Sequence, residues 1–327
     1  MNLADAIWSV LRADTDEELF GTVDPAARYR GLVGVLHPDR VPDAAQRDLA
    51  TEAFVRVTTR WRARRDPVTL RTGRTDYRLG RRAYAGDLAD LYDGGDDRLV
   101  KLPRDPASND LMEREARALR RIAERGDPRY LPYVPRLVDS FRHRDTATGA
   151  ERRVNVVAAA PGLRSLVEVK AAYPGGVDAR DAAWMWRRLL VALGLGHRAG
   201  VVHGAVVPDH VLIEPDGHGL VLVDWCYAAT HRDDRIPALV PGYVDWYPPE
   251  VPNRQPPGPG TDIAMATRCL VHLIGAALPR ALRAFADGCL QPSPRHRPDD
   301  AWRLLGELDD VLERLYGPRT FRPFTLS

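Results

Sequence analysis

The spacing of apolar residues changes twice along the 327-residue chain, and this change restricts the fold more than any other feature. Up to about residue 65 apolar residues recur every three or four positions, as in the run Leu49, Ala53, Phe54, Val57 and Trp61, which is the period of a helix. From Tyr77 short runs typical of strands follow, and helical spacing returns after Gly162. We therefore expect an α+β protein with helices at 1–65, a linker at 66–76, a strand-rich lobe at 77–161 and a helical lobe at 162–327.

The pattern also predicts individual elements of the two lobes. In the first lobe we expect strands over 77–85, 88–93, 98–102 and 153–160, with one helix over about 107–124. In the second lobe we expect helices over 181–199, 262–277 and 299–315, and a small strand pair at 211–213 and 220–223. A turn of Pro215, Asp216 and Gly217 separates the two strands of that pair.

The composition is that of an ordinary globular protein, with 44% hydrophobic and 28% charged residues. A net charge of +2 does not favour nucleic acid or an anionic membrane as a partner, and no run reaches about 18 apolar residues. The three cysteines show no spacing typical of disulfide frameworks or zinc sites. We expect a cytoplasmic protein with neither a nucleic-acid nor a membrane partner.

Lysine is rare in this sequence. It occurs only at Lys101 and Lys170, and arginine supplies the rest of the 47 basic residues, as in proteins of GC-rich, actinobacterial-type genomes. Because a lysine is so seldom retained, Lys101 points to a need for a compact point charge that arginine meets poorly.

Sequence signals typical of one enzyme family follow each other in a fixed order after residue 77. They are Lys101 at the end of a predicted strand, Glu115 on the next helix, a loop that begins at His203, Asp224 after the strand pair, and Glu250 with a distant Arg297. Residues 77–315 therefore resemble the protein kinase fold, which implies two lobes. The resemblance implies that Gly86, Lys101, Glu115 and Asp224 form any nucleotide site, and that Asp224 binds Mg²⁺ if ATP binds there.

The loop at 203–210 departs from the kinase pattern H-R-D-x-x-x-x-N. Ala205 stands at the position of the catalytic aspartate, Gly204 at that of the arginine, and His210 at that of the second metal ligand. A methyl group cannot accept a hydroxyl proton, so the resemblance is to a catalytically impaired pseudokinase, with no catalytic residue expected among His203, Gly204, Ala205 and His210. His210 is either a metal ligand or, more commonly for a lone histidine, a hydrogen-bonded loop residue.

The predicted phosphate-covering loop is altered as well. Gly86 is the only glycine retained, while Tyr84 and Ala89 stand where the other two belong. Asp87 adds negative charge beside the place of a triphosphate, which opposes binding unless a metal compensates. A plain β-hairpin is the alternative interpretation of this segment.

Other matches to the kinase pattern are structural. We expect Glu250 to pair with Arg297 in the interior, and Asp262 to lie at the start of the following helix. Thr230 is the only serine or threonine between Asp224 and Glu250, so the segment offers little to phosphorylate besides tyrosines. We expect it to be held by packing of Trp225, Tyr227, Tyr243 and Trp246.

The tripeptide His37-Pro38-Asp39 lies between two predicted helices of the first part. With Ala27–Leu32 before it and Ala53–Val57 after it, this segment resembles helix II, loop and helix III of a J-domain. The resemblance implies contact with a DnaK-type chaperone through His37, Pro38, Asp39, Arg28, Arg30 and Arg40. A helical hairpin without a chaperone partner is the alternative.

Two functions are consistent with the residues of the sequence. The first is a J-domain and pseudokinase fusion, a non-catalytic scaffold or regulator that links a chaperone contact to an unknown protein partner, with or without bound nucleotide. The second is an atypical ATP-dependent nucleotide or phosphoryl transferase in which Lys101, Glu115 and Asp224 position ATP and another group supplies the base.

Overall fold

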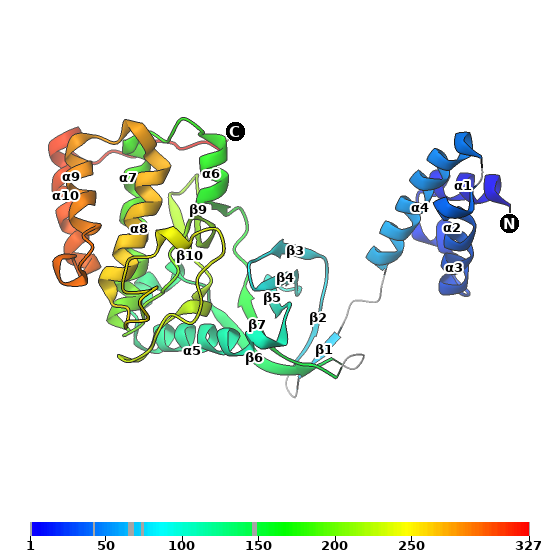
Figure 1. Cartoon of the computed structure of the whole chain (residues 1–327), viewed down its shortest axis with the longest axis horizontal. Helices are drawn as coiled ribbons and strands as arrows, with labels where there is room; N and C mark the ends of the chain where they lie inside the picture. The colour runs from blue at the N-terminus through cyan, green and yellow to red at the C-terminus, as the bar shows by residue number, and fades with distance from the viewer. Residues whose placement is uncertain (1, 42, 65–68, 73–74, 146–148, 327) are drawn as a thin grey trace. The chain divides into compact units, whose positions relative to one another are not determined.

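The computed structural model describes residues 2–41, 43–64, 69–72, 75–145 and 149–326. It divides into two compact units, Met1–Leu70 with Arg78–Arg81, and Arg71–Tyr77 with Arg82–Ser327 (Figure 1). The predicted linker at 66–76 lies partly outside the described residues. Its described part contains β1 (Thr69–Arg71), which forms a two-stranded sheet with β2 (Asp76–Arg78).

The first unit is built from helices that begin at clear sequence signals. They are α1 (Leu3–Arg12), α2 (Asp16–Phe20), α3 (Pro25–Leu36), the 3₁₀ turn η1 (Pro38–Arg40) and α4 (Ala44–Arg64). Side chains of Asn2, Thr15 and Asp24 accept a backbone N–H at the first turns of α1, α2 and α3. Sequence spacing did not indicate the short helix α2.

Aromatic rings pack against the core of the first unit. The rings of Tyr29 and Trp61 are stacked with centroids 4.5 Å apart, and Phe20 meets Trp61 edge-on at 5.1 Å. The predicted buried stripe of α4 is wrong at Leu49, which is 48% exposed, while the neighbouring Ala50 is buried. The small residues Ala50 and Ala53 of α4 face α1 and α3, and Leu49 lies just outside this helix interface.

The strand-rich lobe of the second unit is an antiparallel sheet in the order β3-β4-β5-β7-β6. Its strands are β3 (Arg82–Ala85), β4 (Ala89–Asp93), β5 (Arg98–Pro103), β6 (Leu137–Arg144) and β7 (Glu151–Ala158). The strand expected over 77–85 is interrupted after Arg78 and resumes at Arg82. Strand β6 was not expected, because its sequence is rich in charged residues and only partly buried.

One long helix of this lobe packs on the sheet. After the 3₁₀ turn η2 (Pro106–Ser108), α5 (Asn109–Arg125) packs against β7 with a face of regularly spaced buried residues. That face includes Met112, Ala116, Leu119 and also the charged Glu115. A 3₁₀ turn, η3 (Pro128–Tyr133), then leads into β6.

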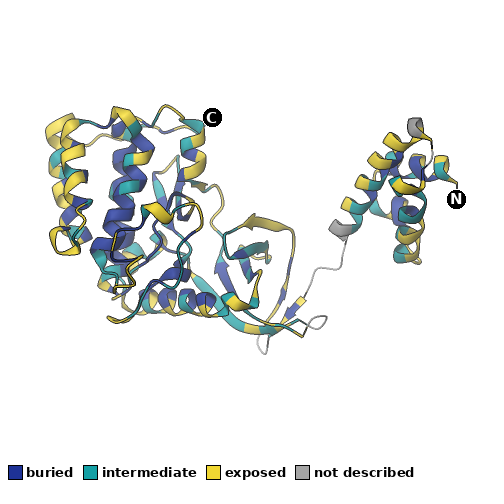
Figure 2. Ribbon diagram, in the orientation of Figure 1, coloured by how far each residue is buried: buried dark blue, intermediate teal, exposed yellow. Residues whose placement is uncertain are grey.

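The helical lobe forms around α7, which is buried along most of its length and lies beside α8 (Figures 1 and 2). Its helices are α6 (Leu166–Ala172), α7 (Ala179–Arg198), α8 (Pro259–Ile274), α9 (Arg280–Cys289) and α10 (Ala301–Tyr316). A small sheet in the order β10-β9-β8 joins β8 (Arg164–Ser165), β9 (Val211–Glu214) and β10 (Gly219–Leu222). Short 3₁₀ turns complete the lobe at η4 (Pro208–His210), η5 (Trp225–Tyr227), η6 (Val244–Trp246), η7 (Gly275–Ala277) and η8 (Pro294–His296).

The predicted α+β class is confirmed by this sheet lobe and helical lobe. Among the residues that the structure describes, none of the helices has both the length and the apolar character that crossing a bilayer requires.

Candidate functional site

Three predicted site residues from distant parts of the chain meet in the second unit. Lys101 on β5 extends its ammonium group to Glu115 Oε1 on α5 at 2.9 Å and to Asp224 Oδ1, which follows β10, at 2.9 Å. Lys101 and Glu115 are buried, and Asp224 is nearly so. Asp224 has left-handed backbone angles, φ 62° and ψ 61°, an unusual conformation that is common at functional sites.

The charges in this cluster stabilise each other. Burial opposes the charged form of Lys101, but the attraction of Asp224, Cys226 and Glu115 raises the pKa of Lys101 well above its ordinary value. Burial likewise opposes ionisation of Asp224, and Lys101 nevertheless holds the pKa of Asp224 below its usual range. Burial raises the pKa of the Cys226 thiol, whose Sγ lies 3.3 Å from Lys101 Nζ. The Lys101 ammonium therefore stays charged at the centre of the cluster, and the Cys226 thiol beside it stays protonated.

A buried amide on β7 positions Glu115. Asn155 donates from Nδ2 to Glu115 Oε2 at 2.8 Å and to the Met112 carbonyl at 2.9 Å, and its Oδ1 accepts from Ser140 at 2.7 Å. Asn155 was not among the site residues predicted from the sequence. The sequence does place this polar residue within the valine-rich run of β7. A fully buried amide in such a strand needs hydrogen-bond partners, so this position could have indicated a buried polar contact.

The loop at 203–210 is anchored by Asp262, at the start of α8. Its carboxylate accepts the backbone N–H of His203 at 2.7 Å and that of Gly204 at 2.8 Å, and it lies 2.9 Å from His197 Nε2. Gly204 has φ +79°, and a Cβ there would lie 2.8 Å from the Tyr227 carbonyl. The backbone geometry therefore requires glycine at this position.

His203 is a buried, neutral member of the same loop. Its Nε2 lies 2.9 Å from the Val223 carbonyl and its Nδ1 lies 3.2 Å from the Ala205 nitrogen. Since a carbonyl only accepts and a backbone N–H only donates, Nε2 carries the proton and Nδ1 accepts. Burial lowers the pKa of His203 to about 4. The side chain therefore links the loop to the strand pair through its neutral form.

The depressed pKa makes stability dependent on pH. His203 takes up a proton near pH 6.5 in the unfolded chain but near pH 4 in the folded chain. The contribution of His203 to the free energy of unfolding is therefore fully present above pH 6.5 and is lost as the pH falls toward 4. Between pH 7 and pH 4.5 we expect the wild type to lose about 2 kcal/mol more than His203→Gln, which cannot titrate. Urea unfolding followed by tryptophan fluorescence measures this difference. Equal losses in both proteins would contradict it.

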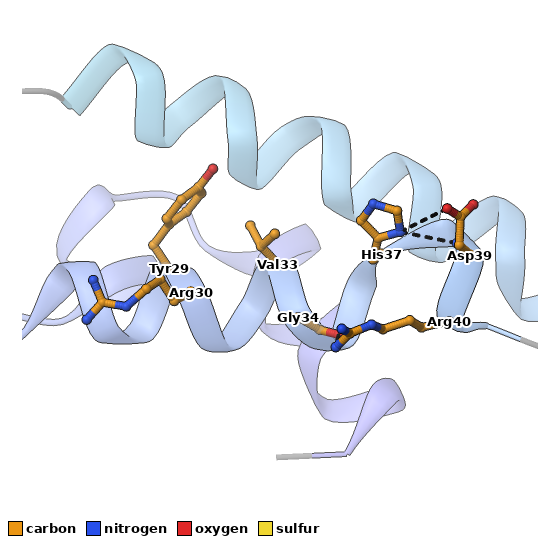
Figure 3. Close-up of a pocket in the computed structure, with 7 residues that line it drawn as sticks. All are labelled: Tyr29, Arg30, Val33, Gly34, His37, Asp39 and Arg40. Atoms are coloured by element: carbon orange, nitrogen blue, oxygen red, sulfur yellow. Dashed lines mark hydrogen bonds and ion pairs between the residues drawn. The ribbon is translucent and has the colours of Figure 1, made fainter.

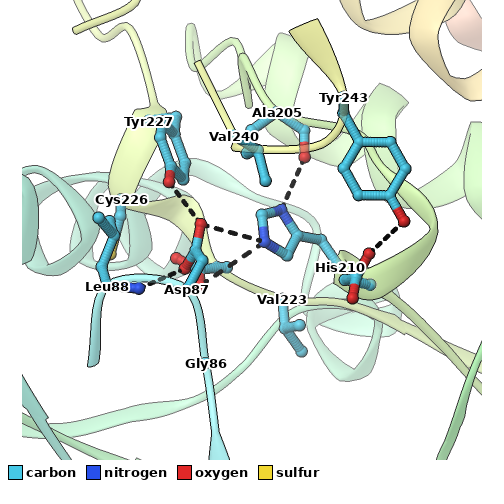
Figure 4. A network of polar contacts seen from close by, with 12 residues as sticks. Gly86, Asp87, Leu88, Ala205, His210, Val223, Cys226, Tyr227, Val240 and Tyr243 are labelled. Atoms are coloured by element: carbon cyan, nitrogen blue, oxygen red, sulfur yellow. Dashed lines mark hydrogen bonds and ion pairs between the residues drawn. The ribbon is translucent and has the colours of Figure 1, made fainter. Parts of the chain in front are cut away.

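The turn between β3 and β4 is joined to the helical lobe (Figure 4). Gly86 donates its N–H to the Ala89 carbonyl at 3.0 Å, and a Cβ on Gly86 would lie 2.8 Å from that oxygen. The close packing of this turn is therefore sufficient to explain why residue 86 is a glycine. The next residue, Asp87, accepts the Leu88 N–H on Oδ1 at 2.7 Å and the Tyr227 hydroxyl on Oδ2. The negative charge of Asp87 was predicted from the sequence, but these contacts were not.

Known proteins resemble the chain mainly in its fold. No family model matches the sequence. The serine/threonine-protein kinase PkaB of Streptomyces coelicolor is 30% identical over 130 residues, which span 35% of this chain and only 31% of that kinase. The kinase domain of Mycobacterium tuberculosis PknI covers 75% of this chain and 98% of that domain, with a TM-score of 0.55 and 13% identity. Vaccinia related kinase 3 covers 76% of this chain and 91% of its own, with a TM-score of 0.59 and 15% identity.

The chain has a protein-kinase-like fold. In such a fold the loop at 203–210 lies where kinases carry their catalytic loop. Ala205 and Val207 are fully buried, and the Ala205 carbonyl accepts a hydrogen bond from His210 Nδ1 at 2.8 Å. The side chains of the loop provide neither a carboxylate at position 205 nor a cation at position 207.

The segment from Asp224 to Glu250 of the kinase-like fold is only partly packed as predicted. Trp225 and Tyr227 are fully buried, but Tyr243 and Trp246 are half-buried, so the expectation of four buried anchors is wrong for two of them. Tyr243 donates its hydroxyl to the exposed Asp209, and its ring meets Trp246 edge-on. Tyr247 is the buried anchor at this end, where its hydroxyl oxygen accepts the Val240 N–H at 3.0 Å.

We expect hydrogen exchange to divide this segment into two parts. Residues 225–230 include Ala229, whose backbone pairs with that of Val202 through two hydrogen bonds. They should exchange at least roughly tenfold more slowly than residues 241–246, most of which are exposed. The pattern should be the same with and without ATP and Mg²⁺, because packing alone holds it. Fast exchange at 225–230 that slows only when ATP is added would show that the segment is a ligand-controlled switch.

The pair expected between Glu250 and Arg297 is present in the interior of the kinase-like fold. Arg297 NH2 lies 2.6 Å from Glu250 Oε2, and NH1 donates to the Gly260 carbonyl at 3.2 Å. The other carboxylate oxygen accepts the Thr261 hydroxyl at 2.8 Å. These contacts join the segment that ends at Glu250 to the first turn of α8 and to the end of η8 in the helical lobe.

The first unit has a separate groove along α3 and η1 (Figure 3). It has a volume of about 400 Å³ and is lined by Tyr29, Arg30, Val33, Gly34, His37, Asp39 and Arg40. His37 Nδ1 accepts the Asp39 N–H at 3.3 Å, and the two side chains are 44% and 89% exposed. Arg28 lies outside the groove and donates from Nε to the Leu19 carbonyl at 3.0 Å, so it ties α3 to α2.

Proposed function

We propose that the kinase-like unit is a pseudokinase that acts as a non-catalytic platform for a protein partner, and that the helical unit recruits a DnaK-type chaperone. One observation carries the first half of this proposal. The position of the catalytic base holds a buried alanine whose carbonyl is already engaged by His210. No group at position 205 can accept the proton of a substrate hydroxyl.

The residues present do not fit the family's chemistry with ATP and Mg²⁺. Val207 provides no charge for a transferring phosphoryl group, and His210 replaces an oxygen ligand with a nitrogen. Asp87 adds a carboxylate that faces the same space as Asp224. Three departures in one site support a binding role for the fold rather than phosphoryl transfer.

The chaperone contact rests on the exposed tip of the first unit and on its resemblance to a J-domain. Arg30 and Arg40 are exposed beside His37, and Arg40 donates to the Gly34 carbonyl at 3.2 Å, which holds η1 against α3. A cationic groove next to a fixed polar tip is complementary to an acidic surface on a partner. The tip is presented by two helices that pack through a core of their own.

Replacing His37 with glutamine should abolish stimulation of a DnaK-type ATPase by the full chain. The rate should fall to that of the chaperone alone, since the lost imidazole lies at the tip rather than in the core. Steady-state ATP hydrolysis by the chaperone from the same organism measures the effect.

Glu52→Gln, on an exposed position of α4, is the matched control and should stimulate like the wild type. Circular dichroism melting of His37→Gln should match the wild type, because the His37 side chain is half-exposed and meets the partly buried Phe54 edge-on. A folded wild-type protein that gives no stimulation would favour a helical hairpin without a chaperone partner.

One observation favours a second candidate function, an atypical nucleotide or phosphoryl transferase. The Lys101–Glu115 ion pair is formed, and Asp224 reaches the same ammonium. In active kinases this pair positions the phosphates of ATP. Transfer of label from either the α- or the γ-phosphate of ATP distinguishes this candidate from the pseudokinase.

A further inference from the structure

A group of potential metal ligands forms where the two lobes of the kinase-like fold meet. Asp87 in the β3–β4 turn, His210 in η4 and Asp224 after β10 each present one ligand atom, and these atoms lie within 4.8 Å of one another. His210 Nε2 is 3.9 Å from Asp87 Oδ2 (Figure 4). The same nitrogen is 3.8 Å from Asp224 Oδ2. Both separations exceed hydrogen-bond distance.

The orientation of His210 points to an occupant between these atoms. Nδ1 lies 2.8 Å from the Ala205 carbonyl, and because a carbonyl only accepts, Nδ1 carries a proton. In the neutral ring Nε2 is then unprotonated, and its lone pair is directed at two carboxylates. Among the described residues Nε2 has no hydrogen-bond partner, although His210 is only 5% exposed. A lone pair of this largely buried side chain that faces two negative groups needs a cation, or a proton, to be stable.

We propose that Asp87 Oδ2, His210 Nε2 and Asp224 Oδ2 bind a divalent first-row transition-metal ion such as Zn²⁺ without any nucleotide. Two ligands about 2.1 Å from one ion lie at most about 4.2 Å apart, and both measured separations from His210 are shorter than this. An imidazole nitrogen favours such ions over Mg²⁺, which prefers oxygen ligands. A histidine that donates its other ring N–H to a carbonyl is the usual arrangement of a metal ligand.

The surrounding contacts hold the two carboxylates in place. Tyr227 donates its hydroxyl to Asp87, and Lys101 engages Asp224 through Oδ1, which leaves Oδ2 directed toward His210. These outer partners orient the ligand oxygens. An ion here would tie the β3–β4 turn to the helical lobe by a bond to Asp87.

A neighbouring group of Glu115, Asp224 and Cys226 is a weaker candidate for a metal. The Lys101 ammonium already lies 2.9 Å from both carboxylates and 3.3 Å from the sulfur. A second cation would have to displace this lysine. The metal site therefore involves the other oxygen of Asp224, on the side of His210.

Calorimetric titration of ZnCl₂ into the chelator-treated full chain, without nucleotide, tests the proposal. We expect one Zn²⁺ per chain, a higher melting temperature with Zn²⁺, and much weaker binding of MgCl₂. Asp87→Asn and His210→Gln should each weaken Zn²⁺ binding by about 10- to 100-fold. Asp87 lies in a turn and is the safer variant for folding.

The matched controls are Asp90→Asn, on the same hairpin, and His231→Gln, an exposed histidine of the helical lobe. Both should bind Zn²⁺ like the wild type. Absence of Zn²⁺ binding by the folded wild type would overturn the proposal and would indicate that a proton on Nε2 balances the carboxylates. Binding that survives both Asp87→Asn and His210→Gln would also overturn it, because the ion would then lie elsewhere.

Discussion

Replacing Glu250 with alanine is expected to lower the free energy of unfolding by about 3–5 kcal/mol. The carboxylate and Arg297 are almost completely buried and lie 2.6 Å apart. The variant leaves the guanidinium charge in the interior with only the Gly260 carbonyl as its partner, and it also removes the acceptor of the Thr261 hydroxyl. An uncompensated buried charge is far more costly than a broken surface pair.

Urea unfolding followed by tryptophan fluorescence measures this loss. Glu307→Ala is the control, because Glu307 pairs with Arg303 on the surface of α10 and should change stability by less than about 1 kcal/mol. The double variant Glu250→Leu with Arg297→Met should be more stable than Glu250→Ala, since it removes both charges. A loss of less than about 1 kcal/mol for Glu250→Ala would show that the pair does not hold the lobe together.

The overall architecture was predictable because the local spacing of apolar residues indicates most of its helices and strands. Helical spacing located α7, α8 and α10 to within a few residues, and alternating or β-branched runs located β4, β5 and β7. Strand β6 was missed because its charged residues are tolerated only by tertiary packing at the sheet edge. Leu49 was misplaced because a helical stripe fixes a buried face only to within about one residue.

The candidate site was predictable only where a residue type belongs to a known constellation. Lys101, Glu115 and Asp224 were identified by resemblance, and the structure brings them together. The contacts of Asp87 with Tyr227 depend on how the β3–β4 turn lies against the helical lobe, which no local pattern specifies. Asn155 was overlooked since a single amide within a strand has no fixed sequence partner.

Phosphoryl transfer by the full chain is expected to be indistinguishable from background. Ala205 cannot accept a proton and Val207 cannot neutralise charge, and in active kinases these positions support transfer at about 1–100 per second. The matched comparison is Asp224→Asn, which removes the remaining metal-binding carboxylate of the family pattern. If the wild type has no transferase activity, the wild type and Asp224→Asn should give the same background signal.

Label transfer from ATP is the measurement that separates a non-catalytic platform from a transferase most directly. The full chain is incubated with Mg²⁺ or Mn²⁺ and ATP labelled at the γ- or the α-phosphate, with general protein substrates and with itself. We predict that protein-bound label from either position will equal that of Asp224→Asn. Incorporation at about 1 per second or faster that disappears in Asp224→Asn would contradict the pseudokinase and establish the chain as an enzyme.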